Sequence, residues 1–123
     1  MMKLLLIDDD AFLRDMYAIK FTESGHEVTA ADTALNALAI IEANQELDVI
    51  LLDMIMPAMS GIELIKEINR LFPDCKAKCI VLSNHGQQDD MDDAMKAGAE
   101  GYIIKAEAVP SDVVKQVEAI AKK

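Results

Sequence analysis

Four short apolar runs in this 123-residue sequence end at polar side chains that could take part in chemistry. Asp8 and Asp9 follow the first run, and Asp53 follows the second. The other two runs end at Ser83 and Lys105. Each run is too short for a typical helix and suits a strand buried on both faces. If these strands are parallel, their carboxyl ends share one edge of the sheet, where open α/β sheets bind ligands.

Three carboxylates at one edge favour a hard divalent cation. Held close together they repel one another, and some would take up protons if no positive charge were present. A small, all-oxygen site with few protein ligands suits Mg²⁺ with water completing the octahedron, and Mn²⁺ could substitute. Lys105 would supply a second, fixed positive charge.

The same groups suit the transfer of a phosphoryl group to Asp53. The transferring group carries negative charge on its equatorial oxygens, and the site must stabilise that charge. Asp53 would be the nucleophile and would form an acyl phosphate. The metal and Lys105 would hold two phosphoryl oxygens, and the Ser83 hydroxyl would bind the third.

Strands and helices alternate between these side chains. The predicted strands are Leu4–Ile7, Glu27–Ala31, Asp48–Leu52, Cys79–Leu82 and Gly101–Ile104. The predicted helices cover residues 11–24, 62–72 and 89–97, with one more beginning after Asp32 or Thr33 and a last one at Pro110. This alternation implies a parallel sheet with right-handed crossovers. The expected fold is α/β: a single-domain flavodoxin-like (βα)5 arrangement with strand order 2-1-3-4-5 and helices on both faces.

Two local features of the helices are also predicted. Asp10 is placed to cap the first helix. In the helix over residues 89–97 we expect Met91, Ala94 and Met95 to form the apolar side.

The composition limits the possible functions. The chain is long enough for one domain with a real core, and 52% of its residues are hydrophobic. Its net charge of −10 disfavours direct binding to nucleic acid or to an anionic membrane. No apolar stretch approaches ~18 residues, and the acidic N-terminus does not resemble a signal peptide, so we expect a cytoplasmic protein. Cys75 and Cys79 are expected to be reduced thiols, with Cys79 packed in a strand.

The chain resembles a response-regulator receiver domain, the CheY-like family of two-component signalling. The resemblance covers about Lys3 to Ala121 and rests on four features: the Asp pair after the first strand, LLDMIMPAMSG, VLS, and AGAEGYIIK. It implies one receiver domain over residues 1–123. We expect no attached output domain and a stand-alone regulator, because the last helix ends without a linker-like composition.

The resemblance also implies roles for individual residues. Asp53 would be the phosphoacceptor, and Asp8, Asp53 and the backbone carbonyl of Ile55 would bind Mg²⁺ directly. Asp9 would act directly or through a bound water. Such a domain catalyses its own phosphorylation and dephosphorylation and is not an enzyme with a free substrate and product.

A two-state switch follows from the same resemblance. Ser83 would be the switch hydroxyl that moves toward the phosphate, and the ring of Tyr102 would move inward behind it. The surface of the fourth helix, fifth strand and fifth helix would change and bind a protein output partner. A histidine kinase or a histidine phosphotransfer protein would be the donor, and the chain would be a monomer or a weak dimer on activation.

The sequence departs from the family pattern beside the site. Ala106 follows Lys105 where the family usually has a proline after a cis bond. A cis bond before alanine costs ~3 kcal/mol, so a trans bond is predicted. Asn84 stands where a small residue is usual and could narrow access to the phosphoryl group.

Three more residues flank the site: Met54, Ile55 and His85. In the family, the positions of Ile55 and His85 tune dephosphorylation. An apolar Ile55 cannot orient a water molecule, which suggests a longer-lived phosphate.

Two alternatives remain open. LLIDDDAF and IVLSN resemble motifs of haloacid-dehalogenase-type phosphatases, with Asp8 as nucleophile, Asp10 as acid, and Ser83 and Lys105 in supporting roles. That alternative leaves LLDMIMP unexplained. The other is a receiver-like module that binds partners without being phosphorylated.

Overall fold

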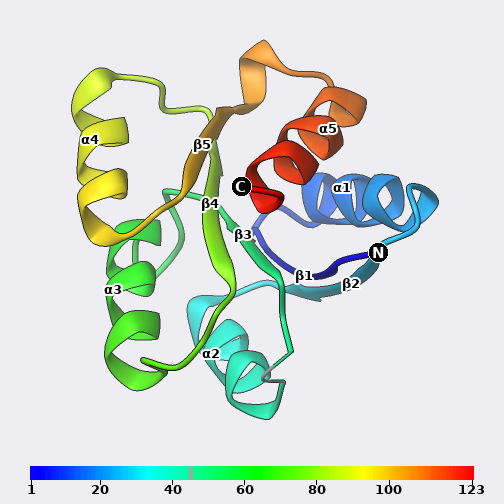
Figure 1. The fold of residues 1–123 in the computed structure, drawn as a ribbon. Coiled ribbons are helices and arrows are strands. Elements are labelled where there is room, and N and C mark those ends of the chain that lie inside the picture. The colour runs from blue at the N-terminus through cyan, green and yellow to red at the C-terminus, as the bar shows by residue number, and fades with distance from the viewer. Residues whose placement is uncertain (45) are drawn as a thin grey trace.

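The computed structural model describes residues 1–44 and 46–123, in which five strands alternate with five α-helices (Figure 1). The strands are β1 (Lys3–Ile7), β2 (Glu27–Ala31), β3 (Val49–Leu52), β4 (Lys78–Ser83) and β5 (Gly101–Ile104). The helices are α1 (Ala11–Glu23), α2 (Ala34–Ala43), α3 (Gly61–Leu71), α4 (Gln88–Ala97), the short 3-10 helix η1 (Lys105–Glu107) and α5 (Pro110–Ala121). The predicted bounds agree closely with these. No helix of the described part combines the length and the apolar character needed to cross a membrane.

All five strands are parallel and lie in the order β2-β1-β3-β4-β5, which confirms the predicted topology. The register brings the ends of neighbouring strands level. Ile7 of β1 lies opposite Leu52 of β3, and Ser83 of β4 lies opposite Ile104 of β5. The residues that follow these strands therefore meet at one edge of the sheet.

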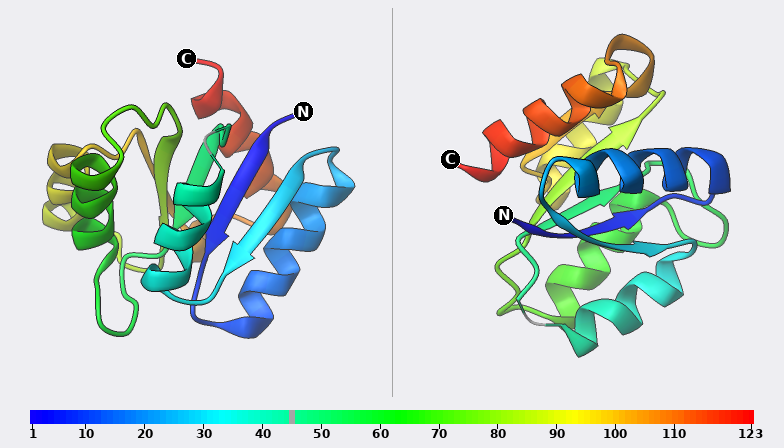
Figure 2. Two further views of the ribbon diagram at one scale, coloured as in Figure 1. Left: turned by 90° about the horizontal axis from the view of Figure 1, so that it is seen from below. Right: turned by 90° about the vertical axis from the view of Figure 1, so that its right-hand side faces the viewer.

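The helices form two layers, one on each face of the sheet (Figure 2). Alternate residues of each strand point to opposite faces, as they must in a pleated strand. In β1, Leu5 and Ile7 pack under α2, α3 and α4, whereas Leu4 and Leu6 pack under α1 and α5. Burial on both faces explains why the strands are apolar throughout.

Side-chain caps fix where three of the helices begin. The side chain of Asp10 accepts a hydrogen bond from the backbone N–H of Leu13, as predicted. Thr33, and not Asp32, caps α2. Ser60 opens α3 through a reciprocal capping box with Glu63. The first and last of these helices start directly after the loops that follow β1 and β3.

The prediction for the inner face of α4 was wrong in one residue. Ala94 and Ala97 are buried, whereas the side chain of Met95 is 49% exposed. Helix α4 packs against α3 and β5. Met95 lies roughly 100° around the helix from Ala94 and points away from these neighbours.

Candidate functional site

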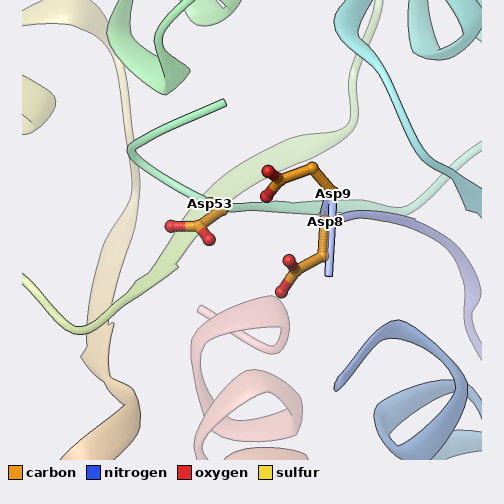
Figure 3. Close-up of side chains that lie close together, drawn as sticks. All are labelled: Asp8, Asp9 and Asp53. Carbon is orange, nitrogen blue, oxygen red and sulfur yellow. The ribbon is translucent and has the colours of Figure 1, made fainter. Parts of the chain in front are cut away.

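Three carboxylates meet where β1 and β3 end. Asp8, Asp9 and Asp53 each offer one oxygen, and these oxygens all lie within 4.8 Å of one another (Figure 3). Asp8 is buried, Asp53 is partly buried and Asp9 is exposed. The structure thus brings the three predicted metal-binding side chains together in a site that opens to solvent beside Asp9.

The side chain of Lys105 reaches the same site from the end of β5. Its Nζ lies 2.8 Å from Oδ2 of Asp8 and 3.1 Å from Oδ2 of Asp53. Burial acts to lower the pKa of Lys105, but the hydrogen bond to Asp8 and the charges of Asp53 and Asp8 outweigh it and hold the pKa above its ordinary value. The ammonium is therefore charged at neutral pH.

The donor set fits a hard divalent cation. All three acidic side chains offer oxygen donors, as Mg²⁺ requires, and one side of the cluster is open to water. With three carboxylates and one ammonium, the formal charge of the cluster is −3 + 1 = −2 when all groups are ionised. A divalent cation would neutralise that charge.

The turn after β1 is held by several hydrogen bonds. The N–H of Asp8 donates to the carbonyl of Ala31 at 3.2 Å and so extends the contact with β2. The N–H of Asp10 donates to Oδ1 of Asp8 at 2.9 Å. Nη1 of Arg14 donates to the backbone carbonyl of Asp8, also at 2.9 Å.

The loop after β3 is packed tightly against the start of α3. The N–H of Gly61 donates to the carbonyl of Met54 at 2.8 Å. A Cβ atom at Gly61 would lie only 2.4 Å from the carbonyl oxygen of Asp53, so only glycine fits there. The N–H of Ile55 lies 3.4 Å from Oδ1 of Asp53, and the Ile55 side chain is exposed.

Ser83 and Tyr102 both contact the backbone of His85. The buried hydroxyl of Ser83 accepts the N–H of His85 at 3.2 Å, and the hydroxyl of Tyr102 donates to the His85 carbonyl. Burial raises the pKa of Tyr102, and hydrogen bonding to Ser83 acts in the opposite direction. The two residues predicted to act as a switch are thus connected through one residue of the β4–α4 loop.

The segment after β5 takes the predicted backbone form. The described residues contain no cis peptide bond, so the bond between Lys105 and Ala106 is trans. Lys105 opens η1 and still directs its ammonium into the site. A pocket of about 570 Å³ lies beside it, lined in part by Asn84, Ala106 and Tyr17.

Sequence reasoning missed three residues at the site. Tyr17 was not singled out, yet the charges of Lys105, Asp8 and Asp53 all act on its hydroxyl. Its pKa is raised, mainly by burial. Neither Arg14 nor Gly61 was singled out.

The structure removes support for the phosphatase alternative. Asp10, which that alternative needs as an acid, uses its side chain to cap α1 and lies outside the cluster of three carboxylates. Asp8, its nucleophile, is 2% exposed and is paired with Lys105.

Comparisons with known proteins agree with this geometry. The sequence profile described as the response regulator receiver domain matches residues 4–118. The chemotaxis protein CheY of Thermotoga maritima is 40% identical over 122 residues, which cover 98% of each chain. The phosphate regulon transcriptional regulatory protein PhoB of Pseudomonas aeruginosa is 31% identical over 120 residues, which cover 98% of this chain and 52% of that protein.

Solved structures share the fold over nearly the whole chain. The chemotaxis protein CheY4 of Vibrio cholerae superposes with a TM-score of 0.89 at 26% identity, covering 98% of both chains. A response regulator receiver domain protein from Clostridium thermocellum gives a TM-score of 0.87 at 29% identity, covering 99% of this chain and 95% of that one.

Proposed function

This chain belongs to the family of response regulator receiver domains of two-component signalling, and from that premise we propose that Asp53 is the phosphoacceptor of an Mg²⁺-dependent switch. The observation that carries the proposal is the convergence on Asp53 of two further carboxylates and the ammonium of Lys105. Of the three acids, Asp53 is neither fully buried nor fully exposed, so a donor can reach it while the site remains structured.

The side chains support phosphoryl transfer in separate ways. Asp8, Asp9 and Asp53, with the carbonyl of Ile55, would hold Mg²⁺, which when bound supplies positive charge to the phosphoryl oxygens. A carboxylate oxygen of Asp53 attacks phosphorus, the bond from phosphorus to the donor nitrogen breaks, and an acyl phosphate forms. Lys105 then exchanges part of its contact with Asp53 for a contact with a phosphoryl oxygen.

The switch would run from Ser83 to the outer surface. The Ser83 oxygen now accepts the N–H of His85, and a movement of the hydroxyl toward a phosphoryl oxygen on Asp53, to which it would donate, would draw it away from His85. Because Tyr102 holds the other end of His85, a movement of this loop changes the environment of the Tyr102 ring on β5 and of the start of α4. We propose that an output partner recognises this face, formed by α4, β5 and α5.

The phosphodonor would be the phosphohistidine of a kinase or a phosphotransfer protein. Three exposed apolar side chains, Phe12, Ile55 and Val109, stand on the loops and helix starts at the carboxyl edge of the sheet. A partner that covers them would exclude water from Asp53 during transfer.

The proposal is tested by intact mass after incubation with acetyl phosphate, with and without Mg²⁺. We expect the wild-type chain to gain one phosphoryl group only when Mg²⁺ is present, and Asp53→Asn to gain none. Asp8→Asn is the matched control, because it removes the same charge from the same cluster and leaves the acceptor in place. It should be modified slowly, and at Asp53.

Two results would redirect the assignment. A wild-type chain that never gains mass would favour the receiver-like module that binds partners without phosphorylation. Full modification of Asp53→Asn together with none of Asp8→Asn would make Asp8 the nucleophile.

A further inference from the structure

Arg14 makes a hydrogen bond that is not explained by the packing of α1. It is the fourth residue of that helix, and its Nη1 donates to the backbone carbonyl of Asp8 at 2.9 Å, back across the helix cap. Asp8 is 2% exposed and lies just beyond the end of β1. Among the described residues, Arg14 is the one hydrogen-bond donor to this carbonyl. A buried carbonyl without a donor is costly, so this bond is a real restraint on the turn.

The carbonyl that Arg14 holds belongs to the peptide between Asp8 and Asp9. The N–H of Asp10, which belongs to the following peptide, donates to Oδ1 of Asp8 at 2.9 Å. The carboxylate of Asp9 has no hydrogen bond to any other described residue, so the orientation of this peptide is what directs it toward the cluster. Fixing the peptide plane therefore restrains the two Cα atoms from which both carboxylates branch.

We propose that Arg14 is a positioning residue for the Mg²⁺ site, acting through the Asp8–Asp9 peptide and not through its charge. This inference rests on the proposed function, in which these carboxylates hold the metal. In metal sites, groups that orient the ligands without touching the ion contribute strongly to affinity.

If Arg14 acted only through its charge, its effect on the affinity for Mg²⁺ would be the opposite of a positioning effect. The charge of Arg14 extends to the neighbouring strand end, where it helps, after Asn36 and backbone hydrogen bonds, to hold the pKa of Asp32 below its ordinary value. A cation this close to the cluster repels Mg²⁺, so deleting its charge alone would tighten metal binding. Deleting a positioning residue would weaken it.

The experiment measures the affinity for Mg²⁺ by calorimetric titration of the unphosphorylated full chain. The variants are Arg14→Met, which removes charge and donor, and Arg14→Lys, which keeps the charge but loses the planar fork. Lys20→Met is the matched control, because Lys20 is a half-buried cation, as Arg14 is, and lies about 9 Å further along the same helix. Urea unfolding of each variant in EDTA records stability separately from affinity.

We expect Arg14→Met to bind Mg²⁺ at least about tenfold more weakly than the wild type, as is typical for losing a group that orients a ligand. The Mg²⁺ affinity of Arg14→Lys should lie between those of Arg14→Met and the wild type. Lys20→Met should bind Mg²⁺ as the wild type does or slightly more tightly. If Arg14→Met does not fold, Arg14→Lys still distinguishes the two roles. A charge-only role predicts wild-type Mg²⁺ affinity for Arg14→Lys, whereas a positioning role predicts weaker binding.

Affinity that is equal or higher in both Arg14 variants would overturn the positioning role and leave the metal site intact. A wild-type chain that binds no Mg²⁺ would overturn the metal site itself and this inference with it.

Discussion

Lys105 and Asp8 form the most deeply buried ion pair among the described residues. Their side chains are 7% and 2% exposed, and Nζ lies 2.8 Å from Oδ2. Asp53 contacts the same ammonium at 3.1 Å. Lys105 therefore occupies oxygens of two of the three carboxylates that we assign to the metal. In the metal-free protein the lysine partly performs the neutralising role that a divalent cation would take.

We predict that Lys105→Met is strongly destabilised without metal and partly rescued by it. Removing one partner of a buried pair leaves an uncompensated charge, which costs about 3–5 kcal/mol. Urea unfolding in EDTA should show this loss, and saturating Mg²⁺ should restore more stability to the variant than to the wild type. Phosphorylation from acetyl phosphate should slow by roughly 10²-fold or more, because a group that stabilises the transferring charge is gone.

Lys96→Met is the control for that experiment, since Lys96 is an exposed lysine of α4. It should change stability by less than about 0.5 kcal/mol with or without Mg²⁺. Equal rescue of both variants by the metal would show that Lys105 and Mg²⁺ do not share oxygens.

A second prediction concerns the contact of Gly61 with the acceptor. Helix propensity alone favours alanine over glycine by about 1 kcal/mol. The Cβ atom of Gly61→Ala would nevertheless lie 2.4 Å from the Asp53 carbonyl, so α3 and the loop must separate. We expect a net loss of about 1–3 kcal/mol in urea unfolding and slower phosphorylation of Asp53.

Gly86→Ala is the matched control. There the added Cβ would meet the flexible end of the Ile104 side chain at 2.7 Å, which can rotate away. A Gly61→Ala variant as stable as Gly86→Ala would mean that the loop after β3 adapts without cost.

A third prediction follows from the buried thiol of Cys79. Burial raises its pKa from 9.0 to about 12, with smaller contributions from Cys75 and Glu100. Because the folded pKa is the higher one, the thiol's contribution to stability is complete below pH 9 and is lost as pH rises toward 12. In Cys79→Ala the free energy of unfolding should therefore fall less steeply over this interval, by at most about 1.4 kcal/mol per pH unit.

Urea unfolding at a series of alkaline pH values measures this slope. Cys75→Ala serves as the control, because Cys75 is a half-buried free thiol in the same region. It should retain most of the wild-type slope, because burial, the largest cause of the raised pKa of Cys79, is unchanged. The assignment fails if the two alanine variants lose stability with pH at the same rate.

The positions of the main site residues could be predicted because they depend on strand ends. A buried run such as Val49–Leu52 has a clear pattern, and Asp53 follows it directly. In a parallel sheet, the residues that follow the strands all lie at the carboxyl edge. Their approximate positions can therefore be predicted without knowing the register. The hydrophobic pattern of each strand and the rule for parallel sheets were sufficient to predict which side chains form the site.

Contacts that depend on the path of a side chain or loop could not be predicted. Arg14 reaches backward over a helix cap to Asp8, a contact for which helical periodicity gives no signal. Tyr102 meets a backbone carbonyl in a loop whose course depends on the packing around it. The error at Met95 has the same origin, because α4 has few apolar residues and the neighbouring elements decide which of them is buried.

The last prediction concerns the connection of Ser83 to Tyr102 through His85. Tyr102→Phe removes only the hydroxyl that binds the His85 carbonyl, so it should cost about 0.5–1.5 kcal/mol of stability. Tyr17→Phe is a matched control, because the Tyr17 hydroxyl makes no hydrogen bond to any described residue and its removal should cost almost nothing. Phosphorylation of Asp53 should proceed at a near wild-type rate in both variants, since neither hydroxyl contacts the acceptor.

The two variants should differ in how phosphorylation is transmitted. Backbone amide shifts in α4 and β5, followed by NMR before and after addition of acetyl phosphate and Mg²⁺, report the change of this face. In Tyr17→Phe these shifts should match the wild type. In Tyr102→Phe they should be smaller, because the hydrogen bond that couples the His85 loop to β5 is missing and only the contact with Ser83 of β4 remains. Full-sized shifts in Tyr102→Phe would mean that Ser83 transmits the signal without the tyrosine hydroxyl. Packing of the ring, which phenylalanine retains, would then be the part of Tyr102 that matters.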